Sequence, residues 1–341
     1  MNLEFVKEII PEIFLTDSPT GYNAAVNEKL IKILNKIGYE ASILNKDTVF
    51  VKIKGKSSEK VVATSAHLDT LGLMVRSISA DGKLNVTNVG GPIAATLNGE
   101  YCKIITRDDV VYTGTILSKA PAAHVYENSN TLPSNFDNLE VRIDEVVKTK
   151  DDVLKLGINN GDYVFIDPKT TITDSGFLKS RFIDDKGSVC AILGVLKELK
   201  DKNITPSYDT YVYFVHQEEV GHGASALAKE ISEFVTVDMG CIGKDLAGNE
   251  YAVSICAKDS GGPYSYDLTN KLINLAKKEN VNYVVDIFPF YGSDIGAAWR
   301  AGIDCKGALI GPGVHASHGM ERTHLSALEE TMKLLYLYLT N

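Results

Sequence analysis

The sequence predicts an α/β domain that is interrupted by a small all-β module. The apolar run Val61–Ala66, which is bounded by charged residues, is typical of a buried central strand. The segment Lys186–Leu199 has an apolar stripe at helical spacing. Between them, from Leu71 to Thr171, short β-branched runs alternate with Gly, Asn and Asp turns. Because 341 residues exceed what one compact core usually organises, we expect one domain from residues 1–70 and 172–341, with residues 71–171 inserted as a second, β-rich domain.

The first part of the α/β domain alternates helix and strand. Residues Ala24–Ile37 carry apolar side chains at helical spacing, at Val26, Leu30, Ile33 and Leu34. Two runs with strand character follow, Glu40–Leu44 and Thr48–Ile53, before the central strand.

The same alternation resumes after the inserted module. In chain order we expect strands Thr210–Val215 and Phe234–Val237, a helix near Tyr266–Lys278, strands Tyr283–Phe288 and Lys306–Ile310, and a last helix that opens with a capping box from Ser326 to Glu329. Within the module we expect strands Met74–Ile78, Leu84–Val86, Tyr101–Thr106, Val110–Ile116, Val141–Val147 and Tyr163–Ile166. The stretch Pro121–Leu139 is rich in Asn, Pro and Ser and predicts a loop.

Composition argues against several classes of protein. The formal net charge of -9 and the pI of about 5.4 disfavour binding to nucleic acid or to an anionic membrane. No apolar run is long enough to span a bilayer, and the N-terminal residues are acidic where a signal peptide would be basic. The five cysteines are scattered without a C-x-x-C pair, so neither a disulfide framework nor a thiolate zinc site is indicated. We therefore expect a protein of the reducing cytoplasm.

Candidate metal ligands follow three of the predicted strands. His67 and Asp69, Glu218 and Glu219, and Asp238 come at or just after strand ends. Open α/β sheets bind ligands beyond the carboxyl ends of their strands, so we expect these side chains to meet. Two further groups lie before or between helices and could join them: Asp184 and Asp185 before the long helix, and His315, His318 and His324 before the last one.

Each of these residues also has a purely structural interpretation. A histidine after a strand is more often hydrogen-bonded than bound to metal, and the pair Asp184-Asp185 fits a helix N-cap. Glu218-Glu219 could form a solvated turn, although two adjacent acidic side chains at the end of an apolar strand repel each other unless a cation lies between them. Taken together, at least three carboxylates and two imidazoles suffice for two divalent cations that share a bridging carboxylate.

Such a site would favour hydrolysis. Two metal ions acidify a shared water and polarise a scissile carbonyl group, while a neighbouring carboxylate accepts the proton and returns it to the leaving amine. The adjacent glutamates suit this division, one as ligand and one as base. The chain contains neither the H-E-x-x-H motif of single-zinc metalloproteases nor the G-x-S-x-G motif of serine hydrolases.

The chain resembles the glutamyl and deblocking aminopeptidases, the TET-type family of dinuclear metallopeptidases. Four motifs carry the resemblance, in family order: Ala66-His67-Leu68-Asp69, Ile183-Asp184-Asp185-Lys186, Gln217-Glu218-Glu219-Val220-Gly221 and Val237-Asp238-Met239. His324-Leu325-Ser326 is similar to a final His-Ser-Pro-type element, and Gly292-Ser293-Asp294 to a Gly-Thr-Asp element near the substrate pocket. The inserted module lies where this family carries its own.

The resemblance implies a mixed-sheet, three-layer catalytic domain of the phosphorylase/hydrolase-like kind with an inserted small β-barrel. It implies that His67 and Asp238 hold one metal, that Glu219 and His324 hold the other, and that Asp184 bridges both; His318 is the alternative to His324. Glu218 would be the general base and Asp69 would orient His67.

The family also implies further properties. The metals would be two zinc or cobalt ions, with manganese as an alternative, and the substrates would be peptides that lose their N-terminal residue. The inserted domain would support dimers and larger homo-oligomers of up to twelve subunits.

Three other functions remain as alternatives. A related dinuclear amidohydrolase, such as a deacylase or a dipeptidase, would normally carry a ferredoxin-like lid, and the helix-poor module argues against one. Glycoside hydrolysis needs two carboxylates, nominally Glu218 and Asp69, but leaves His67, Asp238 and His324 without a purpose. A non-catalytic assembly protein would require a defective site, whereas every ligand type is present.

Overall fold

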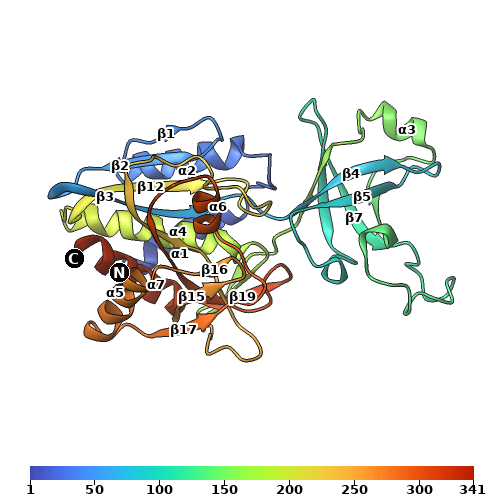
Figure 1. Cartoon of the computed structure of the whole chain (residues 1–341). Helices are drawn as coiled ribbons and strands as arrows, with labels where there is room; N and C mark the ends of the chain where they lie inside the picture. Colours follow the sequence, from blue (N-terminus) through green and yellow to red (C-terminus); the bar gives the residue numbers. More distant parts are fainter. The chain divides into compact units, whose positions relative to one another are not determined.

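The computed structural model describes residues 1–341, which form two compact units. The first unit comprises Met1–Thr70 and Lys169–Asn341, and the second comprises Leu71–Pro168 (Figure 1). The chain thus returns to the first unit at Lys169, three residues before the position expected from the sequence.

A ten-stranded mixed sheet forms the centre of the first unit. Its main path runs β1 (Ser42–Ile43), β2 (Val49–Ile53), β12 (Tyr208–Val215), β3 (Ser57–His67), β13 (Ile231–Val237), β18 (Lys306–Val314), β15 (Val253–Asp259) and β16 (Gly262–Pro263), while β14 (Gly240–Cys241) pairs with β18 and β17 (Tyr283–Ile287) with β15. Strands β12, β3, β13 and β18 are parallel to their neighbours in this set. Their carboxyl ends therefore lie at one edge of the sheet, where the predicted ligands follow them.

Helices and loops cover both faces of this sheet. Five helices share one hydrophobic core against it: α1 (Leu3–Phe14), α2 (Ala24–Lys36), α4 (Ile183–Asp201), α5 (Tyr266–Lys278) and α7 (Leu325–Thr340). The helix α6 (Asp294–Arg300) belongs to the core on the opposite face. Alternation along β3 shows the two faces, because Val62 and Ala66 join the first core and Ala63 joins the second. The domain is a three-layer α/β structure.

A small three-stranded sheet lies beside the main one. It consists of β10 (Thr171–Ile172), β11 (Phe177–Ser180) and β19 (Glu321–His324). In this sheet Phe177 pairs with His324, and Ser180 pairs with Glu321. The pairing ties the histidine-rich loop before α7 to the segment that leads into α4.

The second unit is a closed six-stranded barrel. Its strands pair in the order β4 (Gly72–Ile78), β5 (Leu84–Val89), β8 (Leu139–Ile143), β7 (Val111–Ser118), β6 (Tyr101–Ile105) and β9 (Tyr163–Ile166), and β9 pairs back with β4. Closure leaves no unpaired strand edge. Short helices connect the strands: η1 (Ala94–Thr96), η2 (Phe136–Asn138) and α3 (Lys150–Lys155). The predicted fold class, an α/β domain with an inserted β-barrel, is confirmed.

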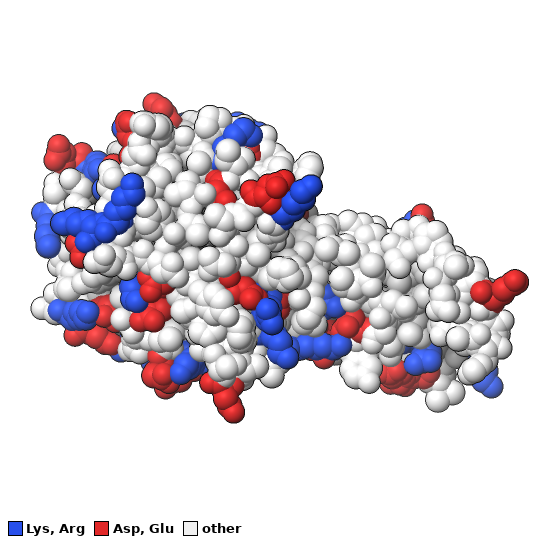
Figure 2. Space-filling view, turned by 90° about the horizontal axis from the view of Figure 1, so that it is seen from below, with Lys and Arg blue, Asp and Glu red and all other residues white.

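Two surface properties accompany this fold. No helix combines the length and apolarity needed to cross a bilayer. On the face shown in Figure 2, acidic and basic side chains are interspersed rather than gathered into one extended patch of a single sign.

Candidate metal centre and active site

The predicted ligands from the three strands come together at the carboxyl edge of the sheet. His67 is the last residue of β3, Glu218 and Glu219 follow β12, and Asp238 follows β13. Asp184 reaches them from the start of α4. His67, Asp184 and Asp238 are each at least nine-tenths buried, with exposures of 2%, 6% and 2%. The cluster is therefore part of the interior and not a group of solvated surface charges.

The donor atoms form two overlapping groups around His67. Atoms of His67, Glu218 and Asp238 lie within 4.8 Å of one another, and so do atoms of His67, Asp184 and Glu219. The Nε2 atom of His67 is 3.1 Å from Oδ1 of Asp184 and 3.8 Å from Oε2 of Glu218. Carboxylate oxygen and imidazole nitrogen at this spacing form the donor set that divalent zinc, cobalt or manganese can use.

The second imidazole of the cluster belongs to His318. Its Nε2 atom is 3.6 Å from Oδ2 of Asp184 and 3.6 Å from Oε2 of Glu219. The prediction preferred His324 and kept His318 as the alternative. In the structure His318 lies beside Asp184 and Glu219, whereas His324 lies at the start of α7. His315 follows β18 and forms a bridge with Arg322, so it belongs to the base of the same loop.

His324 has a structural role instead. Its Nδ1 atom accepts a hydrogen bond from the backbone N–H of Ser326, so it caps helix α7, which begins at Leu325. Its Nε2 atom lies 2.8 Å from the carbonyl oxygen of Ser175, and its ring packs edge-on against Phe177. The capping box expected from Ser326 to Glu329 is therefore wrong, because the histidine two residues before Ser326 caps the helix.

Asp69 supports the neighbouring glutamates as well as His67. Its carboxylate accepts the backbone N–H groups of Glu218 at 3.2 Å and Glu219 at 3.4 Å, and the hydroxyl of Thr20 at 2.7 Å. The Nδ1 atom of His67 lies 2.9 Å from the backbone carbonyl oxygen of Asp69 but 3.6 Å from its carboxylate. Since the carbonyl can only accept, Nδ1 carries the proton and Nε2 is left to face the cluster. The backbone of Asp69 thus orients His67, while its side chain fixes the Glu218-Glu219 turn.

Two further buried carboxylates hold the ligands in place. Asp185 accepts the backbone N–H of His67 at 3.1 Å. Glu321 accepts the backbone N–H of Asp184 at 3.0 Å through one oxygen and that of His318 at 2.9 Å through the other. Glu321 could not be identified from the sequence, because a single glutamate in a polar stretch has no distinguishing pattern. Its position only follows from the pairing of β11 with β19.

The pair Asp184-Asp185 does not form the simple helix cap that the structural interpretation suggested. Both residues have non-helical backbone angles (φ −74°, ψ 100° and φ −122°, ψ 20°), and the residue before the helix, Phe182, makes no side-chain cap. The two carboxylates therefore serve different partners: Asp184 faces the imidazoles of His67 and His318, and Asp185 faces the backbone of β3.

The electrostatics of the cluster call for a cation. Burial raises the pKa of the carboxyls of Glu218 and Glu219 well above their usual range, and burial raises the pKa of Asp238 to about 7. For Asp184 burial acts in the same direction, but its hydrogen bond with His67 leaves its pKa lowered. The Oε1 atom of Glu219 is buried without a hydrogen-bond partner. Divalent cations would satisfy that atom and relieve the repulsion among these carboxylates, so the residues present fit metal ions.

A pocket of about 250 Å³ opens onto the cluster. Its lining combines the carboxylates and His318 with a second group of side chains: Phe290, Tyr291, Ser293 and Arg300. Phe290 is 99% exposed at the rim. Ser293 precedes α6 without capping it and lies 2.8 Å from the hydroxyl of Tyr264. The pocket gives a substrate access to the cluster from solvent.

An α/β domain with buried carboxylates and imidazoles at its strand ends is typical of metal-dependent hydrolases. The model of the M42 glutamyl aminopeptidase family matches residues 47–334. The putative aminopeptidase YhfE of Bacillus subtilis (strain 168) is 42% identical over 332 residues, which cover 97% of this chain and 96% of that protein.

Solved structures agree on the fold. A TET aminopeptidase from a marine-sediment Thaumarchaeota archaeon has a TM-score of 0.87 at 18% identity and covers 98% of this chain and 97% of its own. The TET1 peptidase of Pyrococcus horikoshii has a TM-score of 0.86 at 22% identity, and the match covers 98% of this chain and 99% of that chain. It is described as assembling into a tetrahedron or a large octahedral shell.

The chain belongs to the M42 glutamyl aminopeptidase family. The members of this family are metal-dependent aminopeptidases, which are hydrolases of peptide bonds.

Proposed function

We propose that this protein is a dinuclear metallo-aminopeptidase that releases the N-terminal residue of peptides. The observation that carries the proposal is the convergence of buried carboxylates and two imidazoles, His67 and His318, at one edge of the sheet. Two divalent ions, zinc or cobalt with manganese as an alternative, would acidify a water molecule and polarise the scissile carbonyl group.

The proposed ligands divide between two metal positions. His67 and Asp238 would hold one ion, Glu219 and His318 the other, and Asp184 would bridge them. Asp184 fits the bridging role because one of its oxygens faces His67 at 3.1 Å and the other faces His318 at 3.6 Å. A carboxylate with an imidazole on each side is placed to contribute one oxygen to each metal position.

Glu218 is the proposed general base. Its side chain is 15% exposed, compared with 4% for that of Glu219, so Glu218 is the more accessible of the two from the pocket. Burial raises the pKa of Glu218 well above its usual range, which favours a carboxyl that accepts a proton from the attacking water and returns it to the leaving amine. The backbone N–H groups of both glutamates donate to Asp69. These hydrogen bonds would hold Glu218 in place as the base and Glu219 in place as the ligand.

We further propose that the chain acts as a homo-oligomer in the cytoplasm, built from dimers and reaching up to twelve subunits. The assemblies described for the TET1 peptidase support this, since the fold is shared along nearly the whole chain. The inserted unit also carries apolar side chains that are exposed in the single chain: Val146 at 93%, Val125 at 74% and Tyr101 at 66%. Contacts between subunits would remove such side chains from water.

A panel of aminoacyl-anilides beside their N-acetylated counterparts tests the activity. Protein stripped with a chelator and reloaded with zinc, cobalt or manganese should cleave free aminoacyl-anilides only. Equal cleavage of the N-acetylated series would favour a deacylase, and chelator-resistant cleavage would contradict metal dependence. The panel would also identify the preferred N-terminal residue.

A further inference from the structure

The segment His216–Ser225, which follows β12, carries Glu218 and Glu219. It is neither helix nor strand and turns sharply, with left-handed backbone angles at Gln217 (φ 69°) and Gly221 (φ 86°). Two of its own backbone hydrogen bonds hold the turn, from Gly221 to Glu218 and from His222 to Gln217. The position of the two glutamates therefore depends on what fixes this segment to the rest of the domain.

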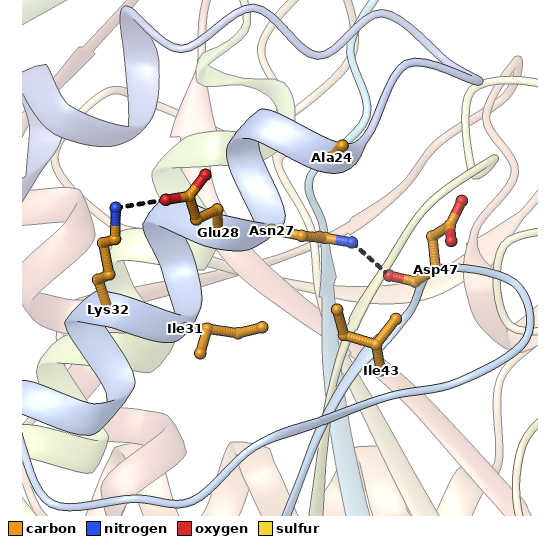
Figure 3. Close-up of a pocket in the computed structure, with 7 residues that line it drawn as sticks. All are labelled: Ala24, Asn27, Glu28, Ile31, Lys32, Ile43 and Asp47. Carbon is orange, nitrogen blue, oxygen red and sulfur yellow. Dashed lines mark hydrogen bonds and ion pairs between the residues drawn. The ribbon is translucent and has the colours of Figure 1, made fainter.

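Asn27 of helix α2 fixes the beginning of the segment. Its Oδ1 atom lies 2.8 Å from Nε2 of His216, and its Nδ2 atom donates to the backbone carbonyl of Asp47 at 2.7 Å. The second bond is drawn in Figure 3, in a pocket of about 480 Å³ between α2 and the turn that precedes β2. The same amide thus holds both the start of the glutamate segment and the turn that contains Lys46.

Lys46 fixes the other end of the segment. Its ammonium group has three donors. It meets the backbone carbonyl of His222, the backbone carbonyl of Gly223 at 3.2 Å and the hydroxyl of Ser225 at 2.8 Å, while Nδ1 of His222 is more distant at 3.5 Å. Ser225 in turn donates to the carbonyl of His222 at 2.9 Å. The Lys46 side chain therefore links two turns that lie about 180 residues apart in the sequence.

Other contacts on this segment are made by residues near the site itself. Asp69 accepts the backbone N–H groups of Glu218 and Glu219, and Asp294 accepts that of Ala224 at 2.8 Å. Lys46 differs from these because it lies outside the residues matched by the family model, which begin at position 47. It is also the cation that satisfies the carbonyl groups of the turn, which Asp69 and Asp294 cannot do because carboxylates only accept.

We propose that Lys46 is a positioning residue for peptide hydrolysis, which holds the segment from Gly221 to Ser225 so that Glu218 and Glu219 keep their places. The proposal rests on the function proposed above. Lys46 touches neither substrate nor metal in this scheme and acts through the two glutamates. A displacement of a catalytic group by about 1 Å can cost on the order of 10²-fold in rate, so loss of three hydrogen bonds at this turn should appear mainly in kcat.

The test compares Lys46→Met, Lys46→Arg and the control Lys56→Met, an exposed lysine in the turn after β2. We expect Lys46→Met to lower kcat by about tenfold or more with KM nearly unchanged. Lys46→Arg, whose guanidinium can still donate to the carbonyl groups, should recover part of the loss. Lys56→Met should match the wild type. Metal content should remain the same in all four proteins.

Hydrogen–deuterium exchange of the peptide covering residues 216–226 gives a readout that needs no substrate. In Lys46→Met this peptide should exchange faster, while peptides from β3 and α4 should stay as in the wild type. Unchanged exchange together with unchanged kcat would overturn the proposal, and so would a rate loss that Lys46→Arg does not relieve. A wild-type protein without aminopeptidase activity would instead count against the proposed function, since the exchange result is independent of it.

Discussion

The Nε2 atom of His318 lies 3.6 Å from Oδ2 of Asp184, although the two residues are 134 positions apart. From the sequence, His318 is only the alternative to His324 as a metal ligand. The contact depends on backbone that the sequence pattern does not reveal. Ala316 and His318 both have left-handed backbone angles, with φ of 60° and 63°. Glu321 then fixes the loop by accepting the N–H of His318. A side chain in an irregular loop is directed by such local features, and not by periodicity.

The first prediction separates the two histidines. His318→Ala should lose about one of the two proposed metal ions and most of the activity, because the proposed second position would lose its imidazole. His324→Ala should keep its metal content and cost about 1 kcal/mol of stability, since it removes a helix cap and a ring contact with Phe177. Metal analysis and thermal unfolding of both variants decide this, and a normal metal content in His318→Ala would contradict the assignment.

The parts of the site at the ends of regular strands could be predicted from the sequence, whereas among the loop residues His318 was only an alternative and Glu321 was not indicated. His67 ends an apolar strand, and Glu218 and Asp238 follow two others; because these strands are parallel in the sheet, the strand pattern alone predicts that the three residues lie at one edge. The fold class followed from the change at Leu71, where short β-branched runs separated by Gly, Asn and Asp turns replace the alternation of helix and strand. Glu321 and His318 depend instead on how a loop pairs with a short strand, and single-sequence patterns carry no such long-range register.

The second prediction concerns Glu218 as the general base that accepts a proton from the attacking water. Glu218→Gln should retain about two metals per subunit and lose 10²–10⁴-fold in turnover, because glutamine cannot accept the proton of the attacking water. The matched variant Glu219→Gln should lose metal as well as activity, since its carboxylate is the proposed ligand. Measuring kcat and bound metal for both proteins distinguishes base from ligand. Full activity of Glu218→Gln, or loss of both its metals, would refute the assignment.

The third prediction concerns stability away from the site. Glu233 on β13 forms an ion pair with Lys60 and accepts a hydrogen bond from the hydroxyl of Tyr338 at 3.0 Å. The ammonium nitrogen of Lys271 lies 3.9 Å from the same carboxylate. Burial acts to raise the pKa of Glu233, but the hydrogen bond with Lys60 and the charge of Lys271 outweigh it, so the pKa lies below its usual 4.5. A lowered pKa means that the carboxylate stabilises the fold above about pH 4.5 and loses this effect as the pH falls further.

Glu233→Gln should therefore destabilise the protein by about 1–2 kcal/mol at pH 7, and the difference from the wild type should shrink below pH 4.5. Urea unfolding at both pH values measures this. Glu59→Gln, an exposed glutamate on β3, provides the control and should behave as the wild type at each pH. A difference of equal size at low and neutral pH would show that packing, and not charge, accounts for the effect of Glu233.

The fourth prediction tests the inserted unit. Replacing Leu71–Pro168 with a short Gly-Ser linker should leave an α/β unit that forms a smaller assembly than the full chain, because the exposed apolar residues of the barrel would be gone. Native mass spectrometry or light scattering gives the number of subunits. The same number of subunits in both proteins would exclude the barrel as an oligomerisation element.

The fifth prediction compares Asp184 with its neighbour Asp185. One carboxylate between two cations neutralises part of both charges, which no terminal ligand can do. Asp184 has an imidazole on each side, whereas Asp185 accepts the backbone N–H of His67. The two residues are thus adjacent in sequence and serve different partners.

Asp184→Asn should therefore weaken both metal positions at once and abolish activity, whereas His318→Ala should mainly weaken one. Asp185→Asn should keep most of its metal, because its amide oxygen can still accept the N–H of His67, although the position of that histidine would be less strictly fixed. Plasma mass spectrometry of the bound metal, together with titration of the apo-protein with zinc, distinguishes the variants. If Asp184→Asn still binds two metals tightly, its carboxylate does not bridge them, and the two positions must be held by separate sets of ligands.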